Sequence, residues 1–287
     1  MLRGLQNIVE YIIVWSFFQL VGLLPPVTAS RFGGWLGRTL GPYIKRTKMA
    51  ERLMAQHLPE LSETQRSDAV TAMWDNMGRI LCEYPHLARG ALDRFITIEG
   101  GEHIQNMIAS NAPSMIVSGH IGNWEILPKA AALSGLKGHI VYRPPNNPFI
   151  DRLIDKQRRS YSLGHYGKGK EGARGTLRAI SRGESFLMLV DQKDNDGALL
   201  PFLNAPAMTM TSAAKLAIKH KLHIVMARSI REHGHHHRVI YYPPITLPEG
   251  DDEAAMLALT QQFNDIIGSW VRDIPSQWFW LHRRWPK

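Results

Sequence analysis

The sequence contains a single cysteine, Cys82, so no disulfide can form within the chain. A reducing compartment fits this composition. The chain also has no run of five basic residues, no zinc-finger spacing and no basic helix followed by heptads, and these absences argue against nucleic acid as a partner. Its 34 Lys and Arg residues nevertheless exceed its 25 Asp and Glu residues. The net charge of +9 favours an anionic lipid surface or a phosphorylated substrate, although a general contribution to solubility stays open.

Two enzyme signatures are missing as well. The polar segments described below are accompanied by neither a Gly-x-Ser-x-Gly nucleophile elbow nor a Walker phosphate loop. The histidine-rich residues 233–237 lie between two strand-like runs and contain glycine, which is typical of a polar hairpin turn rather than a metal site. We therefore expect no metal and no cofactor, and we look for chemistry in the side chains of the chain itself.

The longest apolar segment runs over residues 5–24 and is followed by two prolines, which end a helix. A helix that spans a bilayer needs about 20 mostly apolar residues, so the segment is just long enough. Basic residues follow it more densely than they precede it, which predicts that the rest of the chain is cytoplasmic. We expect residues 1–27 to be a membrane anchor or a helix in the membrane interface. A signal peptide cleaved near Ala29 is the alternative.

Residues 28–287 have the pattern of a single α/β domain. A capping box of Ser62 and Gln65 predicts a helix over residues 63–84, whose apolar stripe we interpret as core. From residue 95 onward, short apolar runs alternate with helical patterns, which indicates a mixed, largely parallel sheet flanked by helices. The expected strands cover residues 95–99, 114–118, 139–142, 185–190, 223–229 and 239–242. The expected helices cover residues 102–109, 124–133, 148–162, 172–181, 209–220 and 252–271.

One strand end carries a histidine and an acid at close spacing. The apolar run 114–118 is followed by His120, then by the bend residues Gly122 and Asn123, then by Glu125 and an apolar helix. Ligands bind at strand ends in α/β sheets, and a histidine there can act as a general base. Because residues five apart on a helix do not face each other, His120 must precede the helix, with Glu125 in its first turn. A capping loop with a solvated glutamate is the alternative.

A second apolar run, over residues 185–190, delivers Asp191 at its end. If the two strands are parallel neighbours, Asp191 approaches His120 and competes with Glu125 as the acid that orients the ring. An aspartate that only caps an Asx turn is the alternative.

A basic segment lies between these two strands. Arg143 begins a loop rich in Pro and Asn, and the helix after it carries Arg158 and Arg159. Arginine at the edge of a pocket can hold a phosphate or a carboxylate through two hydrogen bonds. A solvated basic helix face is the alternative.

Five segments occur together in the order that characterises a known family. They are Ser118-Gly-His-Ile-Gly-Asn-Trp-Glu125, Val141-Tyr-Arg-Pro144 with Asn147-Pro148, Asp191-Gln192, Pro201-Phe202 with Pro206-Ala207, and Gln277-Trp-Phe-Trp-Leu-His-Arg-Arg-Trp285. Over nearly the whole chain, the sequence resembles the bacterial lipid A late acyltransferases, the lauroyl and myristoyl transferases of lipopolysaccharide synthesis. The stretch 202–206 reads Phe-Leu-Asn-Ala-Pro and departs from the Phe-Phe-Gly-x-Pro form expected of the family.

The resemblance implies an enzyme at the cytoplasmic face of the bacterial inner membrane. It implies transfer of a fatty acyl chain from an acyl carrier protein thioester to a hydroxyl of a phosphorylated glycolipid, the lipid A precursor. Its catalytic pair falls on His120 and Glu125, and further polar site positions fall on Asp191 and Arg158, with Arg159 as the alternative to Arg158. We expect catalytic roles for His120, Glu125 and Asp191, and substrate binding by Arg158, Arg143 and Asn123. The alternatives are acyl transfer to another glycolipid or a glycerolipid, and a non-catalytic membrane protein that binds anionic lipids.

Overall fold

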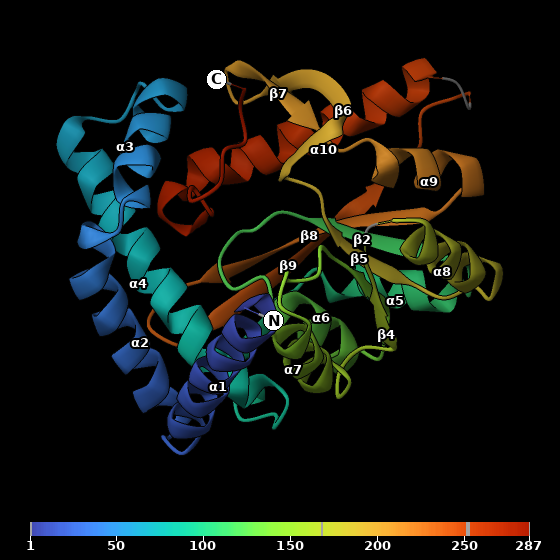
Figure 1. Cartoon of the computed structure of the whole chain (residues 1–287). Helices are drawn as coiled ribbons and strands as arrows, with labels where there is room; N and C mark the ends of the chain where they lie inside the picture. The colour runs from blue at the N-terminus through green and yellow to red at the C-terminus, as the bar shows by residue number, and fades with distance from the viewer. Residues whose placement is uncertain (1, 168, 251–252, 287) are drawn as a thin grey trace.

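A computed structural model describes residues 2–167, 169–250 and 253–286. Its centre is a seven-stranded sheet made of β1 (Ile96–Glu99), β2 (Ser114–Ser118), β3 (His139–Val141), β4 (Gly164–Tyr166), β5 (Phe186–Leu189), β8 (His223–Arg231) and β9 (His237–Ile245). The strand order is β1-β9-β8-β2-β5-β3-β4. Figure 1 labels β9, β8, β2, β5 and β4 of this sheet. Neighbouring strands are parallel except β8 and β9, which form an antiparallel hairpin around the histidine-rich turn. The predicted fold class and the predicted hairpin are confirmed.

Six helices cover the two faces of this sheet. They are α5 (Gly101–Ala109), α6 (Ile126–Leu133), α7 (Pro148–Arg158), α8 (Lys170–Ser181), α9 (Ser212–His220) and α10 (Glu253–Asp273). Successive side chains of a strand point to opposite faces, so Met115 and Val117 join the apolar layer of α8, α9 and α10. Ile116 joins the layer of α5, α6 and α7 on the other face. Figure 1 shows α9 and α10 above the sheet and α6 and α7 below it.

Four helices precede the sheet: α1 (Leu2–Gly22), α2 (Pro26–Leu40), α3 (Arg46–His57) and α4 (Glu63–Leu87). The predicted capping box of α4 is confirmed, because Ser62 and Gln65 each accept a hydrogen bond from the other's backbone N–H. Helix α2 packs on α4 at glycine positions, where a Cβ on Gly78 would lie only 2.0 Å from the carbonyl oxygen of Gly33. These glycines let the two helix backbones approach closely.

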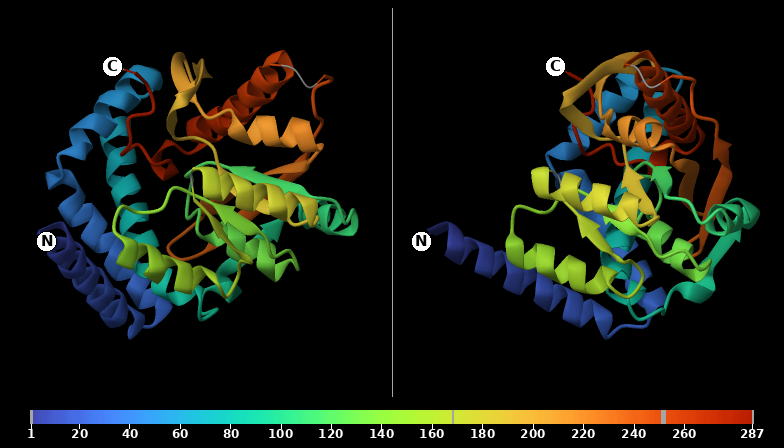
Figure 2. Two further views of the ribbon diagram at one scale, coloured as in Figure 1. Left: turned by 45° about the vertical axis from the view of Figure 1, so that its right-hand side comes forward. Right: turned by 90° about the vertical axis from the view of Figure 1, so that its right-hand side faces the viewer.

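Helix α1 lies along the outside of the body (Figure 2). Among the described residues it is the one helix long and apolar enough to cross a membrane, over Arg3–Gly22. It contacts α7, where the ring centres of Tyr11 and Phe149 are 5.8 Å apart. It also contacts α4, where the ring centres of Phe18 and Tyr84 are 5.6 Å apart. Its body-facing side is thus docked on two helices.

Three strands were not predicted. Strand β4 has three residues at the edge of the sheet, and β6 (Lys193–Phe202) and β7 (Ala205–Thr209) form a separate antiparallel ribbon. Pro201 and Pro206 are partners in that ribbon, and proline ordinarily argues against a strand. The start of α6 also differs from the prediction, since Glu125 is its N-cap residue and not part of its first turn.

Candidate active site

The ends of β2 and β5 meet at one edge of the sheet, because Ser118 and Leu189 are partners in a parallel ladder. His120 and Asp191 follow these two ends at equal distances along the chain, so the register brings them together. Asp191 Oδ1 lies 2.6 Å from His120 Nδ1, and Asp191 Oδ2 accepts a hydrogen bond from the His120 backbone N–H at 2.8 Å. The two strands are therefore parallel neighbours, which is the condition under which Asp191 was expected to approach His120.

The buried carboxylate of Asp191 fixes the state of the histidine ring. Burial acts to raise the pKa of Asp191, but its contacts with His120 outweigh burial and hold the pKa well below its usual range. A charged Asp191 accepts the Nδ1–H of His120, which leaves a lone pair on Nε2. This is the tautomer that a general base needs.

The C-terminal segment closes the other side of this pair. Trp278 donates its indole N–H to Asp191 Oδ2 at 2.7 Å, and Phe279 donates its backbone N–H to the carbonyl oxygen of His120 at 3.1 Å. Sequence reasoning used this segment only as a mark of the family and missed its contacts with the site. Its density of tryptophan is the signal that could have placed it in the core, where Trp278 and Trp280 are fully buried.

Glu125 pairs with Arg158 rather than with the histidine ring. Its Oε1 lies 2.5 Å from Arg158 Nη2 and its Oε2 lies 3.1 Å from Arg158 Nε, a two-point ion pair in which both side chains are 10% exposed. The guanidinium carbon of Arg158 also lies 4.8 Å from the centre of the Tyr142 ring. Arg159, the alternative to Arg158, is exposed and pairs with an acid of its own helix.

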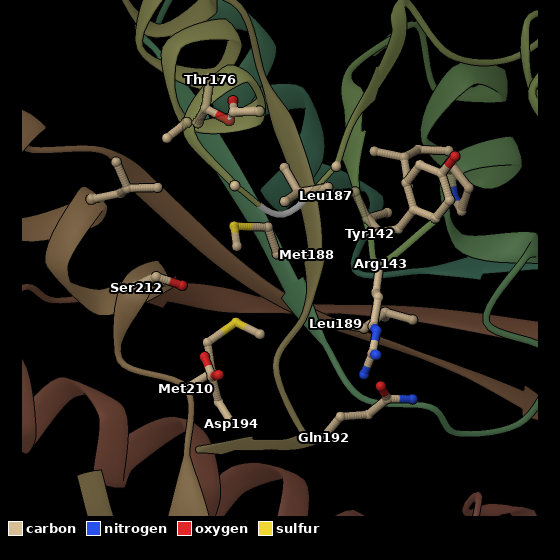
Figure 3. A pocket seen from close by; sticks show the side chains of 18 of the residues that line it. Tyr142, Arg143, Thr176, Leu187, Met188, Leu189, Gln192, Asp194, Met210 and Ser212 are labelled. Atoms are coloured by element: carbon tan, nitrogen blue, oxygen red, sulfur yellow. Dashed lines mark hydrogen bonds between the residues drawn. The ribbon is translucent and has the colours of Figure 1, made fainter. Parts of the chain in front are cut away.

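A cavity of about 740 Å³ adjoins both pairs. Its polar lining includes His120, Glu125, Arg143, Arg158 and Gln192, and its apolar lining comes from β3, β5, α8 and α9. In Figure 3, Leu187, Met188 and Met210 surround its apolar part. Ligand pockets commonly measure about 300–1,000 Å³ and combine an apolar wall with a few polar groups. The cavity therefore suits a ligand with a long apolar part and a polar reacting end.

Asn123 does not line this cavity, contrary to the expected role in substrate binding. Its side chain is fully buried. It donates a hydrogen bond to Glu83 at 2.8 Å and accepts one from the backbone N–H of Glu125 at 3.2 Å. With both polar groups engaged, Asn123 holds the loop that carries His120 and Glu125.

Comparison with known proteins decides the family. Residues 3–287 match the profile of the family described as bacterial lipid A biosynthesis acyltransferase. The chain belongs to this family. The lipid A biosynthesis lauroyltransferase of Escherichia coli K12 is 27% identical, covering 96% of this chain and 92% of that protein. The lipid A biosynthesis palmitoleoyltransferase of the same strain is 22% identical, covering 95% of this chain and 88% of that protein.

A more distant solved structure also aligns. The 1-acyl-sn-glycerophosphate acyltransferase from Thermotoga maritima gives a TM-score of 0.43 at 12% identity, covering 95% of this chain and 99% of that chain. The family alone identifies the protein as an O-acyltransferase of lipid A biosynthesis with a glycolipid acceptor.

The acyltransferase supports its His120 loop from behind through a buried polar network. Glu83 on α4 forms a two-point ion pair with Arg231 on β8, at 2.5 and 2.9 Å. Asn76 on α4 donates to the carbonyl oxygen of Gly122 at 2.9 Å and accepts from Arg231 at 2.8 Å. Burial acts to raise the pKa of Glu83, but Arg231 and a neighbouring histidine hold it well below its usual range. Helix α4 is thus tied to the loop by charged and neutral hydrogen bonds.

Proposed function

We propose that the protein transfers a fatty acyl chain from an acyl carrier protein thioester to a hydroxyl group of a lipid A precursor. His120 is the general base, and Asp191 orients its ring. The observation that carries this proposal is the 2.6 Å contact between Asp191 Oδ1 and His120 Nδ1 beside a largely apolar cavity. The names of the two relatives, a lauroyltransferase and a palmitoleoyltransferase, support a fatty acyl chain as the transferred group.

The proposed reaction is a direct transfer. His120 Nε2 takes the proton of the acceptor hydroxyl as its oxygen attacks the thioester carbonyl carbon. The carbonyl oxygen becomes negative in the tetrahedral intermediate, and the imidazolium is stabilised by Asp191. When the carbon–sulfur bond breaks, the leaving thiolate takes the proton back from Nε2. The products are an ester and the free thiol of the carrier, and His120 returns to its starting state.

The two arginines of the cavity suit an acceptor that carries phosphate. Arg143 is exposed where it lines the cavity, and its guanidinium group can bind a phosphate through two hydrogen bonds. Burial acts to lower the pKa of Arg158, but Glu125 outweighs this effect and keeps the pKa raised, so the side chain stays charged. We assign Glu125 the role of fixing Arg158 for substrate binding, and we assign the orienting of His120 to Asp191.

Surface charge supports the carrier protein as donor. Lys193, Lys215 and Lys219 are exposed and line the cavity, and Arg174 and Arg178 are exposed on α8. A basic rim speeds and orients the docking of an acidic partner. An acyl chain carried on such a partner would enter the cavity between these residues.

The apolar outer face of α1 supports attachment to a membrane. Together with the basic residues that follow α1, it favours the cytoplasmic face of the inner membrane. We retain a division into residues 1–27 as the membrane-attached segment and residues 28–287 as the acyltransferase domain.

Purified protein given an acyl carrier thioester and a lipid A precursor tests the proposal. We expect mass spectrometry to detect one added acyl chain, and we expect His120→Ala to lower the rate by about 10²–10⁴-fold. His233→Ala, at the exposed hairpin turn, is the matched control and should keep the wild-type rate. Full activity of His120→Ala would overturn the assigned base. Lipid A that is unchanged in a deletion strain would overturn the assigned acceptor.

A further inference from the structure

We propose that Gln192 is a further catalytic residue of this site. Its side-chain amide covers the basic nitrogen of His120 before the acceptor binds, and it then donates a hydrogen bond to the thioester carbonyl oxygen during transfer. The inference rests on the acyl transfer proposed above. Sequence reasoning gave Gln192 no role beyond its place after Asp191.

The contact between the two side chains has a definite direction. Gln192 Nε2 lies 3.3 Å from His120 Nε2. Because the Nδ1–H of His120 is directed to Asp191, Nε2 carries a lone pair and accepts. An amide nitrogen can only donate, so the Gln192 N–H points at the lone pair that must take the substrate proton.

The orientation of the amide fits its second neighbour as well. Figure 3 shows the side chains of Gln192 and Arg143 pointing toward one another, with the carboxamide oxygen on the side of the guanidinium. An amide oxygen on the side of the cation and an amide nitrogen on the side of the lone pair agree with the charges of the two groups. Gln192, like Arg143, lines the cavity.

Acceptor binding requires this amide to move aside. An attacking hydroxyl oxygen must lie about 2.6–3.2 Å from His120 Nε2. The Gln192 nitrogen, 3.3 Å from Nε2, now takes up the hydrogen-bonding position of that atom. The thioester carbonyl is then about 3–3.5 Å from that oxygen, within reach of the displaced amide. The displaced amide N–H can then donate to the carbonyl oxygen and stabilise the negative charge that develops on it. Among the titratable groups of the described residues, Asp191 and His282 also act electrostatically on the His120 ring.

The kinetic arm of the test compares Gln192→Ala and Gln192→Glu with the wild type. Both variants lack the amide donor, and the second keeps the shape of the side chain. We expect kcat to fall by roughly 10²–10³-fold, the usual loss for one oxyanion donor, with little change in KM for the acyl donor. Gln262→Ala, exposed on α10, is the matched control and should keep the wild-type kcat. An unchanged kcat, or a loss confined to KM, would overturn the inference.

The second arm needs no substrate. The ring signals of His120, assigned by their absence in His120→Asn, are followed by NMR across pH in the wild type and in Gln192→Ala. Loss of a donor that stabilises the neutral ring should shift protonation of His120 to higher pH, and the acidic limb of kcat/KM should move the same way. An unmoved midpoint would overturn the contact, because a purely structural glutamine would not affect the ring. If the wild type transfers acyl chains and Gln192→Ala transfers them at the same rate, this inference alone is overturned. If NMR shows the contact between Gln192 and His120 but the wild type transfers no acyl chain, the proposed function is overturned. The proposed role of Gln192 in the transfer step is then overturned as well.

Discussion

Asp191 uses two carboxylate oxygens for three hydrogen bonds, from the His120 ring, the His120 backbone and the Trp278 indole. All three partners donate, so the position requires a group that only accepts. An asparagine would instead turn an NH₂ group toward one of them. Where that group donates to Nδ1, the ring proton moves to Nε2 and the base is lost.

We expect Asp191→Asn to lower kcat by about 10⁴-fold in an otherwise folded protein, the cost of a wrong histidine tautomer in a related arrangement. Initial rates of acyl transfer measure the loss, and thermal unfolding checks the fold. Asp68→Asn, exposed on α4, makes the same chemical change away from the site and should leave the rate unchanged. A rate for Asp191→Asn close to the wild-type value would contradict the assigned role.

The Glu125–Arg158 pair lends itself to a double-mutant cycle. Removing one partner of a buried ion pair leaves the other charge unpaired, at a cost of about 3–5 kcal/mol in the free energy of unfolding. We expect Glu125→Ala and Arg158→Met each to destabilise the protein, and the double variant to be more stable than the sum of the two losses predicts. The coupling, measured by urea unfolding, should be about 1–3 kcal/mol. Additive losses would show that the two side chains act independently.

The residues of the site divide into those that local sequence could bring together and those that it could not. The approach of Asp191 to His120 follows from two parallel strands that end in register, which the apolar runs before them indicate. The partner of Glu125 does not follow in this way, because Arg158 lies 33 residues further on, at the far end of another helix. The Trp278 contact depends on how the last segment of the chain folds back over the sheet.

Helices α2 and α4 pack without space for side chains between their glycines. A Cβ at position 78 would lie 2.0 Å from the carbonyl oxygen of Gly33, and a Cβ at position 33 would lie 2.2 Å from that of Gly78. Asn76 and Glu83 on α4 hold the loop of the active site. A change in the distance between α2 and α4 therefore moves the α4 side chains that hold the loop of the active site.

We expect Gly78→Ala to destabilise the protein by about 1–3 kcal/mol, because an added methyl group in a closed contact forces the backbones apart. The rate of acyl transfer should fall together with the midpoint of thermal unfolding. Gly101→Ala is the matched control, since a Cβ there meets only Ile98 at an ordinary 3.8 Å. Equal stability of the two variants would argue against close packing at Gly78.

Which elements could be predicted depended on the strength of their pattern. All six expected strands exist. Five are largely apolar runs inside the sheet or in its hairpin, and β1 is an edge strand in which isoleucine alternates with polar residues. Strand β4 is too short to show a pattern, and the β6–β7 ribbon is largely polar or exposed and contains paired prolines. Strands of that kind are specified by their partners rather than by their own residues.

Helix α1 has an exposed apolar face and a face docked on the rest of the molecule. The exposed side chains include Leu5, Ile8, Val9, Ile12, Ile13 and Leu20. On the docked face, Asn147 at the start of α7 donates to the carbonyl oxygen of Asn7 at 2.8 Å. Beside it, exposed Arg152 and Lys156 of α7 line a cleft of about 300 Å³ with Tyr11 and Trp15, in the middle of α1. If α1 crossed a bilayer, these two cations would lie near its centre.

Each cation at the bilayer centre would cost at least about 2.5 kcal/mol, so we expect α1 to lie along the membrane surface with both ends on the cytoplasmic side. A Gly4→Cys reporter tests this, since residue 4 is exposed and a Cβ there meets nothing within 4 Å. The native Cys82 should stay silent, because burial, aided by Glu83, raises its pKa to about 11 and it is 1% exposed. An impermeant maleimide should label Gly4→Cys in inverted inner-membrane vesicles and not in intact spheroplasts. A Lys137→Cys control on the body of the protein should give the same labelling pattern. Labelling of Gly4→Cys from the periplasmic side alone would mean that the helix crosses, and that α7 separates from it in the membrane.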